Sequence, residues 1–267
     1  NKSFGNKTYK SSNKVKWDDL YDLASLTKIL SSVPLLMNEY ELDNLNLDTT
    51  LSDLLPNMDL NEKENLSIKE MLSHQAGLFP WIPFYKKTID SLTYKPMSNW
   101  YRSSKEEGFS IKVTEDLFLK NVFLDTINVN IINSNLSDDK SYVYSDLPYY
   151  FIKSFLENKN NKDLDDQLKK KLLLGLGANR TTYNPTLSFS KNKIVPSEID
   201  NYFRNTTLHG YVHDMGAAMQ GGIGGHAGLF SNSNDVAKIM QMYIQGGYYG
   251  GIRFFKSSTI DDFNTCY

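Results

Sequence analysis

The chain has 267 residues, of which 40% are hydrophobic and 13% aromatic, enough to bury a sizeable core in one large domain or two joined lobes. Its charge is nearly balanced, with 29 lysines and arginines against 31 aspartates and glutamates, so nothing favours a nucleic acid or an anionic membrane surface as partner. No apolar run approaches the roughly 18 residues of a membrane span, and the polar first residues carry no signal peptide within this segment.

Cysteine and histidine usage argues against a metal centre. Cys266 is the only cysteine, so neither an internal disulfide nor a zinc site built on cysteines is available. The four histidines, His74, His209, His213 and His226, do not form a ligand pattern such as H-E-x-x-H. We therefore expect no metal and no cofactor.

The first predicted elements are a polar, lysine-rich stretch and a long helix. Residues 1–20 hold one strand-like fragment, at residues 2–10. Apolar residues then recur at three- and four-residue spacing from Ser25 to Glu41, which predicts a helix. Pro34 lies inside that helix and is expected to kink it.

The segments that follow alternate turns and helices. "LSDLLPNMD" indicates a short turn followed by a loop, and "LSIKEMLSHQAGL" a helix that is ended by Gly77 and braced near that end by His74. Residues 79–140 are less regular and rich in tryptophan and tyrosine. They predict either a wall or lid over a pocket or a packed satellite subdomain.

Three more helices are predicted toward the C-terminus. They lie at residues 145–157, in the glycine-ended "DLDDQLKKKLLLGLG", and in "SNDVAKIMQMYIQGG", where Ser233 or Asn234 is the expected N-cap. A loop-rich stretch reaches about residue 215, and the glycine cluster "GGIGGHAGLF" precedes the last helix.

The stretch "YDLASLTKIL" places Ser25 three residues before Lys28 at the start of the first long helix. Positions i and i+3 lie on one helix face, so the amine can reach the hydroxyl, and a serine needs such help to act as a nucleophile. Free backbone N–H groups in the first helical turn can help to bind an oxyanion. The alternative is that Ser25 caps the helix and Lys28 is solvated.

The S-x-x-K spacing occurs five times, and the surroundings separate the matches. The other four begin at Ser11, Ser137, Ser188 and Ser190 and lie in polar, loop-like segments. Only Ser25 opens a long helix with apolar periodicity, which is the setting that the chemistry requires.

A second candidate group is Tyr144, in "YVYSDLPYY". Of the 17 tyrosines, it alone has Asn or Asp two places on, in this case Asp146. A phenol that projects into a cleft beside an ammonium group can take up and return a proton. The alternative is a tyrosine packed at the start of a helix.

Together these stretches resemble the serine β-lactamase and penicillin-binding superfamily, and most of all its class C β-lactamase and esterase branch. "YDLASLTKIL" is similar to the nucleophile helix of that branch, "LSIKEMLSHQAGL" to its T-I-R-x-L-L-x-H-T-S-G-L stretch and "YVYSDL" to its Y-S-N motif. "GGHAGLFSNSNDVAKIM" is similar to its G-G-L-x-S-T-x-x-D-x-x-x-F stretch. The stretches "WIPFYKKT", "VHDMGAAMQGGIGGHAGLF" and "FNTCY" resemble even more closely the sequences of β-lactamase-like domains that follow β-N-acetylglucosaminidase domains in some bacterial proteins.

The resemblance implies an α+β, β-lactamase-like fold, in which helices flank an antiparallel sheet and a mainly helical lobe packs beside it. We expect a single domain over residues 1–267 that is cut short at both ends. The helical lobe is expected at roughly residues 45–200, and the sheet-bearing lobe at roughly 1–44 and 201–267.

By the same resemblance, Ser25 is the acylated nucleophile and Lys28 the neighbouring amine of the proton network. Tyr144 is the general base toward Ser25 and then the acid toward the leaving group. The backbone N–H of Ser25 is an expected oxyanion donor. The implied reaction is the hydrolysis of an ester, amide or peptide through an acyl-enzyme, without metal or cofactor.

Asp146 stands where the family has an asparagine. An asparagine amide can donate a hydrogen bond to a substrate carbonyl, whereas an ionised aspartate only accepts. Asp146 therefore favours a cationic group on the substrate, or it pairs with Lys28. Such a pair would stabilise the ammonium and weaken it as a free base, which favours Tyr144 for the proton transfer.

His226-Ala227-Gly228 resembles the third family motif, K-T-G or H-x-G, on the edge strand of the active site. The following "LFSNSNDVAKIM" instead places this run upstream of the third motif, as glycine-rich backbone close to the pocket. The third motif is then expected beyond Tyr267. The candidate substrate-binding residues are Asp146, His226 and Gly228.

The competing interpretation is a non-catalytic ligand-binding module that kept the fold. A glycosidase is less favoured, because such enzymes use paired carboxylates across a sugar site. The resemblance further implies a periplasmic or other extracytoplasmic location in a bacterium. It also implies a small-molecule or peptide substrate, such as a cell-wall-derived peptide, and a covalently linked glycosidase domain.

Overall fold

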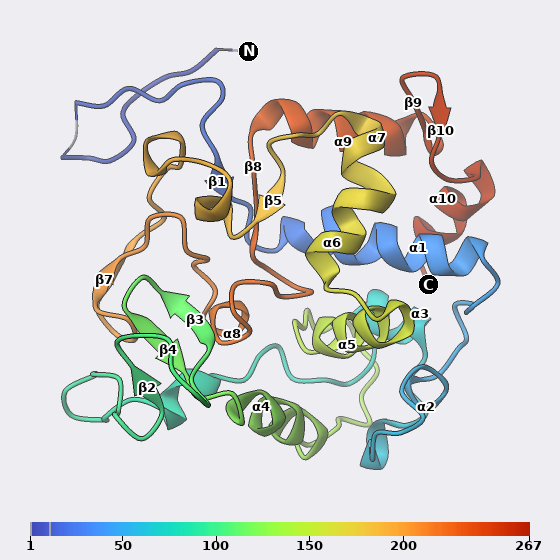
Figure 1. The fold of residues 1–267 in the computed structure, drawn as a ribbon. Coiled ribbons are helices and arrows are strands. Elements are labelled where there is room, and N and C mark those ends of the chain that lie inside the picture. Colours follow the sequence, from blue (N-terminus) through green and yellow to red (C-terminus); the bar gives the residue numbers. More distant parts are fainter. Residues whose placement is uncertain (1, 11) are drawn as a thin grey trace.

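The computed structural model describes residues 2–10 and 12–267 and combines helices with small antiparallel sheets, so the α+β expectation is confirmed (Figure 1). The α-helices run over Val33–Glu41 (α1), Leu51–Leu54 (α2), Ile68–Leu72 (α3), Phe123–Ile132 (α4), Pro148–Asn160 (α5), Leu164–Leu168 (α6), Leu174–Leu176 (α7), Met215–Ala218 (α8), Ser233–Ile244 (α9) and Ser257–Phe263 (α10). The strands run over Tyr21–Asp22 (β1), Tyr101–Arg102 (β2), Ile111–Thr114 (β3), Leu117–Leu119 (β4), Thr182–Tyr183 (β5), Ile199–Asp200 (β6), Thr206–Thr207 (β7), Leu229–Ser231 (β8), Tyr248–Tyr249 (β9) and Ile252–Arg253 (β10).

The sheet β1-β8-β5 joins three segments that are far apart in the chain (Figure 1). Both pairings are antiparallel, and Phe230 of the central strand lies opposite Asp22 on one side and Thr182 on the other. All three residues of β8 are buried, as expected for a strand that is covered on both faces. Directly after β1, the N–H of Leu23 donates to the carbonyl of Leu229 at 2.9 Å. The sheet thereby fixes the chain just before Ser25.

The helix that carries Ser25 and Lys28 is interrupted rather than continuous. Helical backbone begins at Leu26, passes through a π-helical turn over Lys28–Ser32 and continues as α1. Pro34 lies in the first turn of α1 and has no N–H for the i→i−4 ladder. The expected interruption at Pro34 thus takes the form of a wider turn just before it.

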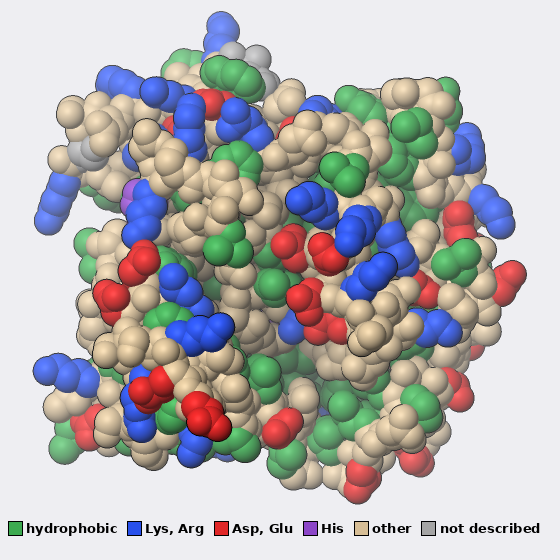
Figure 2. All heavy atoms as spheres, viewed as in Figure 1, with side chains coloured by type: hydrophobic (Ala, Val, Ile, Leu, Met, Phe, Trp, Pro, Cys, Tyr) green, Lys and Arg blue, Asp and Glu red, His purple; other side chains and the backbone are tan. Residues whose placement is uncertain are grey.

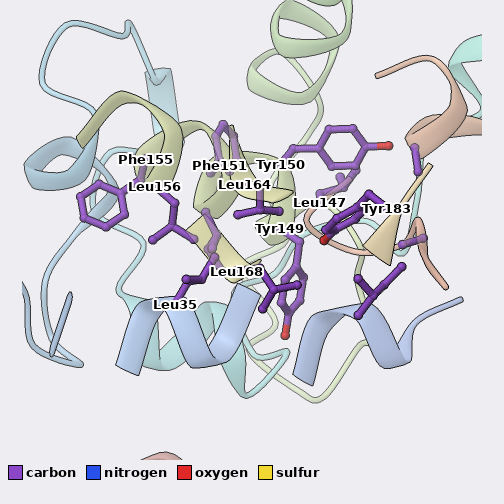
Figure 3. Close-up of a cluster of buried hydrophobic side chains, with 14 of the residues drawn as sticks. Leu35, Leu147, Tyr149, Tyr150, Phe151, Phe155, Leu156, Leu164, Leu168 and Tyr183 are labelled. Carbon is purple, nitrogen blue, oxygen red and sulfur yellow. The ribbon is translucent and has the colours of Figure 1, made fainter. Parts of the chain in front are cut away.

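Helix α5 packs its apolar face against α1 and α6. Figure 3 shows Phe151, Leu156 and neighbouring side chains of α5 in one buried cluster with Leu35 of α1 and Leu164 of α6. Burial of apolar surface contributes about 25 cal/mol per Å², so a cluster of this size holds the helices together. The start of α5 follows Tyr144 and Asp146 closely in sequence, and this packing therefore sets those two residues against the helical segment that carries Ser25 and Lys28.

Two helix boundaries differ from the prediction. Helix α3 ends at Leu72 and not at Gly77, because His74 already takes a left-handed conformation with φ of 58°. Helix α9 is capped by Asn232, whose side chain accepts a hydrogen bond from the N–H of Asp235 at 2.9 Å. The predicted caps, Ser233 and Asn234, are instead the first two helical residues.

The segment of residues 79–140 contains a small sheet and a helix that the sequence did not reveal. Strands β2, β4 and β3 form an antiparallel sheet in that order, and α4 follows it (Figure 1). Strands of two to four residues show too little alternation to be recognised. The strand expected at residues 2–10 is replaced by an isolated bridge between Asn6 and Lys14, while Ser11 lies outside the described residues.

The division into lobes stays a prediction. Strand β5 of the β1-β8-β5 sheet comes from within residues 45–200, the range expected to be helical, and so does the whole β2-β4-β3 sheet.

Acidic and basic side chains are interspersed over much of the visible face, in keeping with the nearly balanced charge (Figure 2). In the described part of the chain, no helix combines the length and the apolarity needed to cross a bilayer.

The loop before β8 requires glycine where it passes close to other backbone. A Cβ atom at Gly225 would lie 2.2 Å from the carbonyl oxygen of Tyr149 on α5. At Gly228, φ is +117°, and a Cβ atom would lie 2.3 Å from the carbonyl oxygen of Gly222. Side chains at either position would push the loop away from its neighbours.

We expect Gly228→Ala to lower the free energy of unfolding by about 2–4 kcal/mol, because it combines an unfavourable φ with a backbone overlap. Gly251→Ala is the matched control, since Gly251 has φ of +86° and open space around it. The control is expected to lose about 1 kcal/mol. Urea denaturation of both variants measures the difference, and equal losses would contradict the close packing at Gly228.

Candidate active site

Ser25 is exposed and precedes the first helical residue. Within the described ranges, its backbone N–H makes no hydrogen bond, so this donor is free beside the hydroxyl. The residue before it, Ala24, has φ of 45°, a left-handed conformation that is uncommon for any residue but glycine. The turn thus presents both a hydroxyl and an N–H group to solvent.

Lys28 brings three candidate residues together. Its side chain is nearly inaccessible, with 4% exposed. The ammonium donates to the hydroxyl of Ser25 at 2.9 Å, to the phenol oxygen of Tyr144 at 2.8 Å and to the carboxylate of Asp146 at 2.6 Å. The carbonyl of His226 lies 3.5 Å away. An ammonium has three protons, and these three near acceptors engage all of them.

The other S-x-x-K matches in the described part of the chain show no such geometry. Lys140 bonds to the carbonyl of Ala76, Lys191 to Glu115 and Lys193 to Asp18, and none of the three bonds to the serine of its own match. Helical context at Ser25 therefore distinguishes the pair that meets from the pairs that do not.

The segment of Tyr144 to Asp146 is held by both backbone and side-chain hydrogen bonds. The N–H of Asp146 donates to the carbonyl of Pro80 at 2.8 Å, and the hydroxyl of Ser145 donates to the carbonyl of Phe79. Tyr144 keeps 43% of its surface exposed, while its phenol oxygen accepts a hydrogen bond from the buried Lys28. The two side chains that bond Lys28 are thereby held by hydrogen bonds that do not involve Lys28.

His74 supports Tyr144 from the side. Its Nδ1 atom accepts a hydrogen bond from the N–H of Ser145 at 3.2 Å, and its ring centroid lies 4.5 Å from that of Tyr144. Burial, followed by the positive charge of Lys28, lowers the pKa of His74 below its usual 6.5. The ring is therefore neutral at pH 7 and can accept at Nδ1. The sequence predicted that His74 braces a helix end near Gly77, but α3 ends before His74, and the His74 side chain instead contacts the Tyr144 segment.

His226 approaches the site with its backbone. Its side chain is 2% exposed, and its Nε2 atom lies 2.8 Å from the carboxylate of Asp214. The ring stacks on Tyr150 with centroids 4.7 Å apart. Gly228 shapes the same loop through its positive φ. This matches the expectation of glycine-rich backbone near the pocket, while substrate contact by His226 or Gly228 stays a prediction.

Asp214 was not recognised from the sequence. It caps α8 by accepting from the N–H of Ala217 at 2.7 Å, and it bonds to His226. Burial raises the pKa of Asp214, but the charge and hydrogen bond of His226 outweigh this effect and set that pKa to about 2. An aspartate directly before the first residue of a helix is a usual N-cap signal, yet it gives no sign of the distant histidine.

A cavity of about 20 Å³ lies between Asp146, Asp214, His226 and the rings of Trp81 and Tyr150. This volume holds one water-sized group. The ligand atoms of the two aspartates and His226 lie within 4.8 Å of one another, which is close enough for metal binding. However, the Asp146 carboxylate already accepts from Lys28, and the Asp214 carboxylate already bonds Nε2 of His226, so these side chains have partners without an added ion.

Two further hydrogen bonds connect the helical segment that carries Ser25 and Lys28 with the glycine-rich loop. The hydroxyl of Thr27 accepts from the N–H of Leu229 at 3.1 Å, and the hydroxyl of Ser32 donates to the carbonyl of Gly225 at 2.6 Å. Together with the Lys28–His226 contact, these bonds fix the helix and the loop as one wall of the site.

Known proteins resemble this chain in sequence and in fold. The sequence profile of the Beta-lactamase family matches residues 1–251. The chain belongs to the beta-lactamase family. A protein of Escherichia coli (strain K12), provisionally named a D-alanyl-D-alanine carboxypeptidase, is 28% identical over 265 residues, which cover 92% of this chain and 55% of that protein. The chain therefore spans about half the length of the curated relatives that it matches.

Solved structures of the family share the fold. The octameric penicillin-binding protein homologue from Pyrococcus abyssi aligns with a TM-score of 0.66 and 18% identity, covering 97% of this chain and 51% of that one. A class C beta lactamase from Rhodobacter sphaeroides aligns with a TM-score of 0.63 and 14% identity, covering 97% of this chain and 60% of that one. The expected β-lactamase-like fold is confirmed.

The lowered pKa of His74 predicts how stability depends on pH. As the pH falls below 6.5, the unfolded chain binds a proton at this position before the folded chain does, so stability is lost. His74→Asn removes the titration and tolerates the positive φ. Chemical denaturation at pH 7 and pH 5 should show a smaller loss in the variant than in the original protein. Equal losses would contradict a neutral His74 in the folded state.

Proposed function

We propose that this domain is a serine hydrolase that cleaves an ester, amide or peptide through an acyl-enzyme on Ser25. The observation that carries the proposal is the pair of distances from the Lys28 ammonium, 2.9 Å to the Ser25 hydroxyl and 2.8 Å to the Tyr144 phenol. Membership of the beta-lactamase family supports this class of chemistry. The bonds of Lys28 link a nucleophile and a proton acceptor through one cation.

In the first step, the Ser25 oxygen attacks the substrate carbonyl and passes its proton to Tyr144, which accepts it as a phenolate and becomes a neutral phenol. The ammonium of Lys28 stabilises negative charge on the Tyr144 oxygen at 2.8 Å. The free N–H of Ser25 donates to the carbonyl oxygen as it becomes an oxyanion. When the intermediate collapses, the bond to the leaving group breaks and Tyr144 returns the proton to it. Water then releases the acyl group by the same route.

Asp146 limits what Lys28 can do in this scheme. Lys28 donates to Asp146 at 2.6 Å and to Ser25 at 2.9 Å, and an ammonium that donates in this way has no lone pair with which to take the serine proton. Tyr144 is the better base for this reason. The second carboxylate oxygen of Asp146, which does not bond Lys28, then remains to accept from a cationic group of the substrate.

We further propose that the substrate is a cell-wall-derived peptide and that the domain works outside the cytoplasm of a bacterium. The name of the Escherichia coli relative, which refers to a D-alanyl-D-alanine carboxypeptidase, supports a peptide substrate. The link to a glycosidase domain has no support in the comparisons and stays a prediction from the sequence resemblance.

The second candidate is a ligand-binding module without turnover, and the ion pair between Lys28 and Asp146 is the observation that favours it. Hydrolysis of a small activated ester separates the two functions. A hydrolase should turn over the ester, and Ser25→Ala should abolish that turnover. A binding module should show no rate above background in either form.

Labelling with a fluorophosphonate tests the nucleophile. We expect one adduct, at Ser25 by peptide mapping, and none in Ser25→Ala, because the reagent needs an activated hydroxyl. Tyr144→Phe should slow labelling by about 10²–10⁴-fold, the usual contribution of a general base. Ser188→Ala, from another S-x-x-K match, is the control and should label normally. An unchanged adduct in Ser25→Ala would refute the proposed chemistry.

The carboxylate of Asp146 predicts a preference for cationic substrates. For a matched pair of activated esters, one with an amine and one neutral, Asp146→Asn should lower the ratio of kcat/KM values by about tenfold, as expected for one lost charge-assisted hydrogen bond. Asp116→Asn, an exposed carboxylate, is the control. A ratio that Asp146→Asn leaves unchanged would place the carboxylate outside the binding step.

A further inference from the structure

The turn before Ser25 is held in a strained conformation. Ala24 has φ of 45°, where the Cβ atom crowds the backbone, and the cost at such positions is on the order of 1–3 kcal/mol unless neighbours stabilise the conformation. Ala24 is exposed, so packing of its methyl group does not hold it there. Some other contact must keep this turn in place.

Asp22 supplies that contact with both of its carboxylate oxygens. Oδ1 accepts from the N–H of Ala24 at 2.9 Å, which closes the turn across two residues. Oδ2 accepts from the N–H of His213 at 2.6 Å, 191 residues away in sequence. The backbone of Asp22 is itself fixed in β1 opposite Phe230. One carboxylate therefore connects the nucleophile turn with the loop that leads into α8.

The loop on the far side of Asp22 is rigid enough to act as an anchor. The carbonyl of His213 accepts from a guanidinium nitrogen of Arg204 at 2.7 Å, and another nitrogen of Arg204 donates to the carbonyl of Val212. Arg204 is paired at 2.6 Å with Asp200, and both side chains are fully buried. Arg204 thus holds the peptide groups on both sides of His213, and Asp22 bonds the N–H of the first of them.

We propose that Asp22 is a positioning residue, which holds the Ala24 turn against the His213 loop and so presents the Ser25 hydroxyl and N–H for acylation. The inference rests on the proposed function of Ser25. Asp22 touches neither the Ser25 hydroxyl nor Lys28, so it acts through the backbone of Ala24 and not on the reacting atoms.

A carboxylate is the side chain that this position requires, because both partners are N–H donors and both oxygens must accept. An asparagine offers one acceptor and one donor, so it can satisfy Ala24 or His213 but not both. An alanine satisfies neither. Glycine at position 24 would adopt the positive φ without a Cβ penalty and would need the bond less.

The test is the rate of fluorophosphonate labelling at Ser25 in matched variants. Asp22→Ala should lower the maximal rate of labelling by about tenfold, while the reagent concentration for half-maximal rate stays the same. Asp22→Asn should give an intermediate rate. The double variant Asp22→Ala/Ala24→Gly should recover most of the loss, because the turn is no longer strained. Asp90→Ala removes a similar i→i+2 bond from an exposed turn and should label normally.

Far-UV circular dichroism and thermal unfolding check that each variant is folded. A folded Asp22→Ala that labels at the original rate would overturn the proposal, as would a glycine at position 24 that restores nothing. Where Asp22→Ala does not fold, the comparison of Asp22→Asn with Asp22→Asn/Ala24→Gly decides in the same way. Failure of the proposed function is distinct, since the original protein would then carry no adduct at Ser25.

Discussion

The buried ammonium of Lys28 is the constraint on which the site depends. Removing a charge of this kind from water costs several kcal/mol unless its partners replace the lost hydration. Three acceptors do so, from Ser25, Tyr144 and Asp146, and the carbonyl of His226 adds a fourth oxygen nearby. The most distant of these acceptors lies 198 residues from Lys28 in sequence, so the fold must bring them together for the lysine to be buried at all. The cation thus selects an arrangement in which a hydroxyl and a phenol oxygen both lie within hydrogen-bonding distance of it.

The glycine-rich loop makes this burial possible by approaching the helix with bare backbone. Gly225 lies against the carbonyl of Tyr149, and the Ser32 hydroxyl bonds to the carbonyl of Gly225. The same loop brings the carbonyl of His226 toward Lys28, while the His226 ring turns to Asp214. A loop with side chains at these positions would stand farther from the helix and would leave the ammonium in contact with water. Close packing against the helix and burial of the Lys28 ammonium therefore both require a loop without side chains at these positions.

What could be predicted from the sequence was local. The i, i+3 spacing of Ser25 and Lys28 in an apolar-periodic helix, and the Y-S-D run that ends at Asp146, identified the groups that meet. The roles of His74 and Asp22 could not be foreseen, because their hydrogen bonds reach across 71 and 191 residues and leave no periodic trace. The small sheet within residues 79–140 was missed for a different reason, since its strands are shorter than the patterns that reveal a strand. The α9 cap was misplaced by one or two residues, because Asn, Ser and Asn adjoin there and each can cap a helix.

The wide separation of the three acceptor segments also has a kinetic meaning for the newly made chain. Ser25 and Lys28 emerge close together, but Tyr144 lies 116 residues further on and the His226 carbonyl later still. Under the proposed function, a nascent or partly unfolded polypeptide would carry Ser25 without its proton acceptor, so cellular esters would not acylate this serine before the fold is complete. A reactive Ser25 hydroxyl would then indicate that the chain has reached its native structure.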